Sequence, residues 1–220
     1  MNDSKKDSMN ESISSPVSVK VCGITRLQDA ELAIELGAHA IGFVLAPSPR
    51  QISTSQAKSI SRQIPKSVHR VGVFVDPSVE YLRESVLQAE LSGIQLHGRE
   101  TPDFVKVVRE MFPEVLLIKA LPLSLASEVD ALVCDAILID PPRLDDQALQ
   151  HRPLPEPLKK KFMYLAGGLT TENVAGFIRS HMPQGVDVSR GVESSPGLKD
   201  AVKMKTFFAQ INGSSARRSQ

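Results

Sequence analysis

The stretch RVGVFVDPSVEYLRESVLQAELSGIQLH, Arg70–His97, contains two short apolar runs separated by an amphipathic helical pattern. The first run, RVGVFV, is continuous rather than alternating, which is typical of a strand buried on both faces of a parallel sheet. Val79, Leu82 and Val86 then recur at the spacing of one helical face. The second apolar run, GIQLH, closes the pattern. The stretch therefore predicts one strand–helix–strand unit.

The same unit repeats along the whole chain. Strand starts are expected near residues 19, 40, 71, 93, 115, 136, 163 and 186, mostly 21 to 23 residues apart. Eight such units favour an α/β fold in which a single (β/α)8 TIM barrel closes on itself. An open doubly wound sheet is the alternative, but it rarely needs eight evenly spaced strands, and no G-x-G-x-x-G follows the first strand.

Capping residues indicate where several helices begin. Ser53 precedes TSQAKSI, Thr101 precedes Pro102, and Thr170 has Asn173 nearby. Two further helices are expected to turn apolar stripes toward the barrel, made of Phe104, Val107, Val108 and Met111 in one and of Val174, Phe177 and Ile178 in the other.

The composition is that of an ordinary globular chain. It is 41% hydrophobic and 23% charged with a formal net charge of +1, which gives no reason to expect nucleic acid or an anionic membrane as partner. Two cysteines do not make a disulfide framework, so we expect a cytoplasmic protein. No apolar run approaches the roughly 18 residues of a membrane span. We expect polar tails at residues 1–17 and 212–220 around a barrel domain at 18–211.

Chemistry in a barrel belongs at the carboxyl ends of the strands. AGGL after strand seven and SRGVE after strand eight favour a phosphate site, because glycines let backbone N–H groups turn toward an anion. The alternative for Gly167 and Gly168 is a tight turn before the next helix. Cys22 ends the first strand, although most free cysteines are small buried hydrophobes.

Three other strand ends carry polar side chains. Arg50 follows the stiff loop APSP, which suits a planar clamp on a carboxylate, and its alternative is an ordinary exposed arginine. Asp140 ends the apolar run AILI and suits a general acid, or else a cap or ion pair. His97 in QLHG is either a polar wall of the site or a satisfied core residue.

The motifs of several other enzyme classes are missing from the sequence. The five histidines are scattered, with no H-E-x-x-H or C-x-x-C, so no metal is expected. There is also no P-loop and no serine nucleophile elbow. A reaction without a cofactor on a small phosphorylated substrate remains, and Cys134 is interpreted as a packing residue.

The motifs KVCGIT, GFVLAPSPR, VGVFVD, QLHG, ILID, LAGGL and GVDVSRGVESSPGLKD, in this order, resemble those of phosphoribosylanthranilate isomerases of tryptophan biosynthesis. The resemblance runs from about Val19 to Phe208. It implies a (β/α)8 fold, in agreement with the repeat. It also implies an Amadori rearrangement of N-(5'-phosphoribosyl)anthranilate to 1-(2-carboxyphenylamino)-1-deoxyribulose 5-phosphate. We expect no cofactor, and a monomer or homodimer.

The resemblance also implies roles for individual residues. The family's general base falls on Cys22 and its general acid on Asp140. The arginine that meets the anthranilate carboxylate falls on Arg50, with His97 and Asp187 as further substrate-binding residues. The implied phosphate-binding residues are Gly167, Gly168, Ser189, Arg190 and Gly191.

The sequence departs from the family after Asp140. Family members carry a Gly-rich loop ending in F-x-W there, which helps to cover the substrate, whereas residues 141–158 read PPRLDDQALQHRPLPEPL. Arg190 replaces a commoner serine, and we interpret it as compensation for a lost phosphate contact. Two alternatives stay open: a barrel isomerase acting on another aminoaldose phosphate, and a non-catalytic barrel that binds a phosphorylated metabolite or a partner protein.

Overall fold

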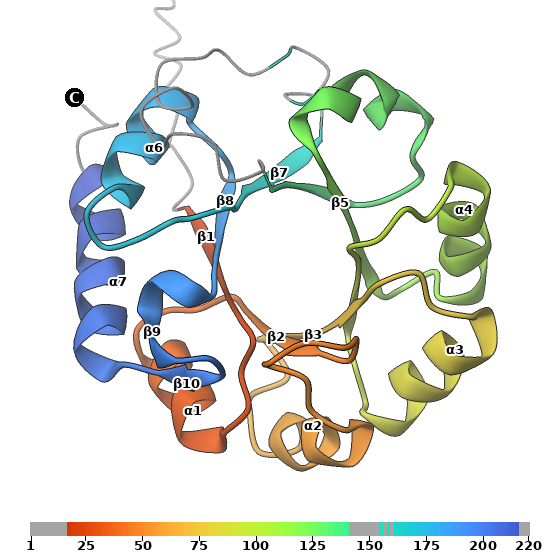
Figure 1. The fold of residues 1–220 in the computed structure, drawn as a ribbon, viewed down its shortest axis with the longest axis horizontal. Helices are drawn as coiled ribbons and strands as arrows, with labels where there is room; N and C mark the ends of the chain where they lie inside the picture. The colour runs from red at the N-terminus through yellow and green to blue at the C-terminus, as the bar shows by residue number, and fades with distance from the viewer. Residues whose placement is uncertain (1–16, 141–154, 156–157, 159–160, 216–220) are drawn as a thin grey trace, which may run out of the picture.

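The computed structural model of the chain describes residues 17–140, 155, 158 and 161–215. Eight parallel strands form a closed barrel in chain order, and helices surround the ring (Figure 1). All eight strands begin within two residues of the predicted starts, and the predicted (β/α)8 barrel is confirmed. The strands are β1 (Ser18–Cys22), β2 (Ala40–Val44), β3 (His69–Phe74), β4 (Gly93–Leu96), β5 (Leu116–Leu121), β6 (Ala136–Ile139), β7 (Phe162–Leu165) and β8 (Gly185–Val188).

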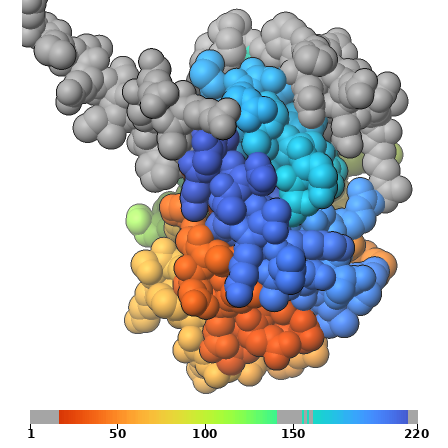
Figure 2. All heavy atoms as spheres, turned by 90° about the vertical axis from the view of Figure 1, so that its left-hand side faces the viewer, coloured from red at the N-terminus to blue at the C-terminus, as the bar shows by residue number. Residues whose placement is uncertain are grey.

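Pairing of the first strand with the last closes the ring. Ser18 lies opposite Gly185 and Val21 opposite Val188 in parallel register. The ends of the described chain meet on the outside as well, because the last helix packs between the first helix and the one before it (Figure 2). An open sheet is therefore excluded.

Helices follow most strands, as the repeat predicts. They are α1 (Leu27–Glu35), α2 (Thr54–Ser61), α3 (Val79–Gln88), α4 (Pro102–Met111), α6 (Val174–His181) and α7 (Ala201–Ser215). The segment after β5 instead forms a 3-10 helix, η1 (Leu123–Ala131), which is broken by the non-helical backbone of Leu125. A short 3-10 helix, η3 (Arg190–Val192), and a hairpin of β9 (Glu193–Ser195) and β10 (Leu198–Lys199) follow β8.

The strands bury side chains on both faces, which explains their continuous apolar runs. An outer core lies between the barrel and the helices, and Cys134 packs there, as predicted. A smaller cluster fills the inside of the ring. Its members are Ala40, Val71, Ile118, Ala120, Ala136, Leu138, Tyr164 and Ala166.

Two of the three predicted helix caps are confirmed. The Ser53 hydroxyl accepts a hydrogen bond from the Gln56 N–H, and the Gln56 side chain accepts one from the Ser53 N–H. The Thr101 hydroxyl accepts a hydrogen bond from the Phe104 N–H at the start of α4, without a reciprocal bond. The prediction for Thr170 is wrong, because α6 begins after Asn173. The Asn173 side chain accepts a hydrogen bond from the Thr170 N–H at 2.7 Å and so stabilises a turn ahead of the helix.

The predicted apolar stripe of α4 is wrong at one residue. Val107 is 42% exposed, whereas Val105 is fully buried beside Val108. The buried face is thus centred on the pair Val105 and Val108, one turn apart, and Phe104 lies at its edge. The predicted stripe of α6 is buried as expected.

The chain ends bear on the expected domain limits. Helix α7 continues to Ser215, past residue 212, where the polar tail is expected to begin. Residues 1–16 and 216–220 lie outside the described part, so the division into tails and barrel stays a prediction. Among the residues that the structure describes, no helix is long and apolar enough to cross a membrane.

Candidate active site

The predicted site residues meet at the carboxyl ends of the strands. Cys22 is the last residue of β1, His97 follows β4, Asp140 follows β6, and Asp187 lies in β8. Because side chains alternate along a strand, Cys22 shares the inner face of β1 with Lys20. The site is therefore built from one end of the barrel interior and the loops above it.

Lys20 is fully buried within the ring, although the sequence analysis assigned it no role. Its Nζ donates a hydrogen bond to Asp187 Oδ1 at 2.8 Å. Burial lowers the pKa of an ammonium group, but the Asp187 carboxylate and the Cys22 thiol outweigh burial and raise the pKa of Lys20. Lys20 is therefore a permanent positive charge beneath Cys22.

The Cys22 side chain is only 7% exposed. Burial raises the pKa of its thiol, while the Lys20 and Lys199 ammonium groups oppose that increase. Space for the pair comes from Gly42 on β2, which pairs with Cys22. A Cβ at Gly42 would lie 2.9 Å from Cys22 Sγ and 3.1 Å from Lys20 Nζ.

Arg50 forms a two-point ion pair with Glu193. Its Nε and Nη2 donate to Glu193 Oε1 at 2.8 Å and Oε2 at 2.6 Å. The carboxylate is 3% exposed and also accepts a hydrogen bond from Lys199 Nζ at 2.9 Å. Burial raises the pKa of a carboxyl, but the hydrogen bonds from Arg50 and Lys199 outweigh it and hold the pKa of Glu193 at about 2.

Lys199 links this ion pair to the rest of the site. Its Nζ also donates to the backbone oxygens of Cys22 at 2.6 Å and Ser189 at 3.3 Å. Burial lowers the pKa of Lys199, although Glu193 opposes that effect. One buried ammonium thus connects the end of β1, the loop after β8 and the partner of Arg50.

The two glycine loops lie in contact. Gly167 and Gly168 have φ of 81° and 77°, the left-handed region that glycine favours. A Cβ at Gly191 would lie 1.9 Å from the backbone oxygen of Leu169, so the loops after β7 and β8 meet closely at Gly191. Arg190 is exposed beside them. The structure therefore brings the five predicted phosphate-binding residues into one region.

His97 lies next to the predicted acid. Its Nε2 is 3.3 Å from Asp140 Oδ2, and its Nδ1 is 2.7 Å from Gln95 Nε2. With the buried Gln95 amide as donor, Nδ1 accepts and the Nε2 proton faces the carboxylate. Asp140 is 41% exposed, so a ligand can reach it.

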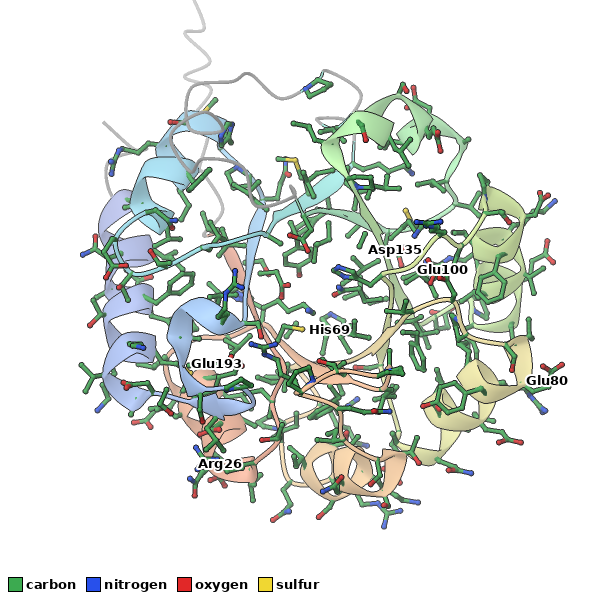
Figure 3. All side chains as sticks on the ribbon, viewed as in Figure 1. Arg26, His69, Glu80, Glu100, Asp135 and Glu193 are labelled. Atoms are coloured by element: carbon green, nitrogen blue, oxygen red, sulfur yellow. The ribbon has the colours of Figure 1, made fainter. Side chains whose placement is uncertain are left out.

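Another buried ion pair supports the other side of the barrel mouth. Lys119 Nζ donates to Glu100 Oε2 at 2.7 Å, and Glu100 also accepts hydrogen bonds from the Gly98 N–H. Glu100 and Glu193 lie on opposite sides of the strand ring (Figure 3). This pair fixes the loop that follows His97.

Sequence reasoning missed Lys20, Glu193 and Lys199. One signal was present, since a lysine inside the apolar run VKV has to be buried with a partner. Within the described ranges, no group of three or more His, Cys, Asp or Glu side chains is placed to hold a metal ion.

A closed eight-stranded barrel with ionisable side chains and glycine loops at the carboxyl ends is the architecture of a (β/α)8-barrel enzyme. Residues 19–210 match the family model described as N-(5'-phosphoribosyl)anthranilate (PRA) isomerase. The chain belongs to this family of isomerases of tryptophan biosynthesis, which confirms the resemblance found in the sequence.

Individual relatives agree with the family match. The N-(5'-phosphoribosyl)anthranilate isomerase of Pelobacter propionicus is 37% identical over 196 residues, which cover 87% of this chain and 94% of the relative. A crystal structure of phosphoribosyl anthranilate isomerase in complex with reduced 1-(o-carboxyphenylamino)-1-deoxyribulose 5-phosphate is similar, with a TM-score of 0.78, 36% identity and coverage of 90% and 99%. A crystal structure of monomers generated from the dimeric isomerase of Thermotoga maritima is also similar. Its TM-score is 0.75, its identity is 34%, and 90% of this chain and 99% of that chain are covered.

Proposed function

We propose that this chain converts N-(5'-phosphoribosyl)anthranilate to 1-(2-carboxyphenylamino)-1-deoxyribulose 5-phosphate by an Amadori rearrangement, with Cys22 as general base and Asp140 as general acid. The observation that carries the proposal is the placement of this thiol and this carboxyl at the ends of separate strands, at one mouth of the barrel. A relative crystallised with the reduced product supports the choice of substrate.

The chemistry needs both groups. The Asp140 carboxyl donates its proton to the furanose ring oxygen as the C1–O bond breaks, which leaves a protonated Schiff base at C1. The Cys22 thiolate then removes the C2 proton, and the C–H electron pair forms a C1–C2 double bond while the iminium pair returns to nitrogen. The resulting enolamine tautomerises to the ketone. Each such proton transfer typically contributes about 10²- to 10⁴-fold in rate.

The remaining predicted residues hold the substrate in this proposal. Arg50 uses its Nε and Nη2 edge on Glu193, and the opposite edge, with Nη1, is available for the anthranilate carboxylate. His97 and Asp187 contact the sugar. The phosphate lies against the loops that carry Gly167, Gly168, Ser189, Arg190 and Gly191.

The test is fluorimetric. The purified full chain is expected to consume freshly made phosphoribosylanthranilate, and Cys22→Ser and Asp140→Asn are each expected to reduce turnover by at least about 10²-fold. Cys134→Ser is the matched control, because that thiol packs in the outer core. Normal turnover in Asp140→Asn would show that the acid is assigned wrongly.

The alternatives from the sequence have their own outcomes in this assay. Activity of the wild type only on another aminoaldose phosphate would favour a changed substrate range, and binding without turnover would favour a non-catalytic barrel. The altered loop after Asp140 falls mostly on residues 141–160, of which the structure describes only Pro155 and Leu158, so its effect on the substrate stays a prediction.

Assembly and compartment complete the proposal. A monomer or a homodimer is proposed, since one relative is described as dimeric, and light scattering of the purified chain distinguishes the two. The cytoplasm is proposed because Cys22 and Cys134 are both free thiols.

A further inference from the structure

Lys20 and Cys22 form a buried stack on the inner face of β1. The two residues are two positions apart, so both side chains point into the barrel, and Lys20 is fully buried. Nζ of Lys20 and Sγ of Cys22 both lie within about 3 Å of the Cβ position that Gly42 leaves empty. The ammonium group therefore lies no more than 6.0 Å from the sulfur.

Asp187 is the opposing member of this arrangement. The Asp187 carboxylate, on the neighbouring strand β8, accepts the hydrogen bond from Lys20. Asp187 raises the pKa of Cys22, whereas Lys20 lowers it. Two more cations act on the thiol from outside β1, namely Lys199 on β10 and Arg50 in the loop after β2. The charged and titratable groups around the stack are Lys20, Asp187, Tyr164, Lys199, Arg50 and Glu193.

A thiolate in this position has lost almost all contact with water. Moving a charge out of water is costly, and a nearby opposite charge offsets that cost most strongly where the solvent is excluded. Lys20 cannot leave the sulfur, because its ammonium is enclosed in the ring and held by Asp187. Its charge is available whether or not substrate is bound.

We infer that Lys20 is a positioning residue that stabilises the thiolate of Cys22, and that Asp187 limits this stabilisation. The inference rests on the proposed function, in which Cys22 is the base. Lys20 is fully buried, so it acts on the reaction through Cys22 and not by contact with the substrate. Lys20 raises the fraction of Cys22 that is a thiolate and can remove the C2 proton, and Asp187 lowers that fraction.

The experiment measures thiolate formation directly. In a Cys134→Ser background, the rate of alkylation of Cys22 by iodoacetamide is followed against pH, because only the thiolate reacts. Lys20→Met is expected to raise the apparent pKa of Cys22 by at least about one unit, a tenfold smaller thiolate fraction at neutral pH. Lys20→Arg keeps the charge and is expected to restore most of the reactivity.

Asp187→Asn provides the matched opposite change. It removes the negative charge beside Lys20 and is expected to lower the apparent pKa of Cys22 and speed alkylation at neutral pH. Two shifts of opposite sign from neighbouring substitutions are not produced by a merely structural role. Equal shifts in the same direction, or unchanged profiles, overturn the inference.

A double variant covers the case in which Lys20→Met does not fold because it leaves Asp187 buried without its partner. Lys20→Met with Asp187→Asn removes both charges at once. The apparent pKa of Cys22 is still expected to rise above wild type, since Lys20 acts more strongly on the thiol than Asp187 does. A double variant with the wild-type profile also overturns the inference.

The outcome for Lys20 is separable from the outcome for the isomerase reaction. A wild type without isomerase activity whose alkylation profiles shift as expected contradicts the proposed function and leaves the Lys20–Cys22 relation intact. An active isomerase whose alkylation profile is unchanged by Lys20→Met contradicts only the inference about Lys20. In the active enzyme, the acidic limb of kcat/KM is expected to shift with the alkylation profile.

Discussion

Replacing Glu193 by Gln tests whether the Arg50–Glu193–Lys199 cluster stabilises the barrel. Glu193 is a single carboxylate between two cations, and it also accepts a hydrogen bond from the Gly197 N–H. The substitution keeps the size of the side chain and removes its charge. It leaves Arg50 and Lys199 with like charges and no anion between them.

The pKa of Glu193 gives the magnitude. It falls from an ordinary 4.5 to about 2 in the folded protein, because the hydrogen bonds from Arg50 and Lys199 outweigh burial. One unit corresponds to about 1.4 kcal/mol, so the ionised carboxylate contributes on the order of 3 kcal/mol to the free energy of unfolding. That agrees with the cost of about 3–5 kcal/mol for removing one partner of a buried ion pair.

The sign follows from the direction of the shift. A carboxyl with a lowered folded pKa stabilises the protein fully above its unfolded pKa and loses that effect as the pH falls toward the folded value. Glu193→Gln is therefore expected to lower the free energy of unfolding at about pH 7, with the difference from wild type shrinking between about pH 4.5 and pH 2.

Urea unfolding followed by circular dichroism, at about pH 7 and about pH 3, measures this difference. Glu90→Gln is the matched control, because Glu90 is an exposed glutamate paired with Arg62, and surface ion pairs contribute little. If Glu193→Gln lowers the free energy of unfolding by the same amount at both pH values, the stabilisation does not come from the ionised carboxylate and the assignment is refuted.

Two further substitutions probe the loops after β7 and β8. Gly191→Ala places a Cβ 1.9 Å from the backbone oxygen of Leu169, so we expect the free energy of unfolding to fall by about 1–3 kcal/mol, as measured by thermal unfolding. Gly213→Ala is the control, because its Cβ meets nothing within 4 Å and the substitution is expected to be neutral or slightly stabilising. A wild-type melting curve for Gly191→Ala would contradict the close contact. Arg190→Ala is expected to raise KM for phosphoribosylanthranilate with little change in kcat, and an unchanged KM would remove Arg190 from the phosphate site.

The strands could be predicted from the sequence because their signal is local. A strand buried on both faces needs a continuous apolar run, and the run around Val71 identifies β3 without knowledge of its neighbours. The buried face of a helix also depends on how the helix packs. Val105 and Val107 are equally apolar in the sequence, and only the angle at which α4 packs against the barrel decides that Val107 faces solvent.

The candidate site residues were predicted from the strand ends and the loops that follow them. Cys22 and Asp140 follow that rule, and the structure places both at the barrel mouth. Glu193 and Lys199 do not follow it, because they lie in a hairpin beyond β8. Their roles depend on contacts with Arg50 and with the end of β1, and the spacing of residues in the chain does not predict such long-range pairs.

Closure of the ring between β1 and β8 has a consequence for folding. The ion pair of Lys20 with Asp187 joins residues 167 positions apart, and the hydrogen bond from Lys199 to Cys22 spans 177 positions. Contacts of such sequence separation form slowly, because a long loop has to close first. A chain emerging from the ribosome contains Lys20 and Cys22 from the start but gains Asp187, Glu193 and Lys199 only with the last unit. The pH dependence of this one thiol therefore reports when the barrel has closed.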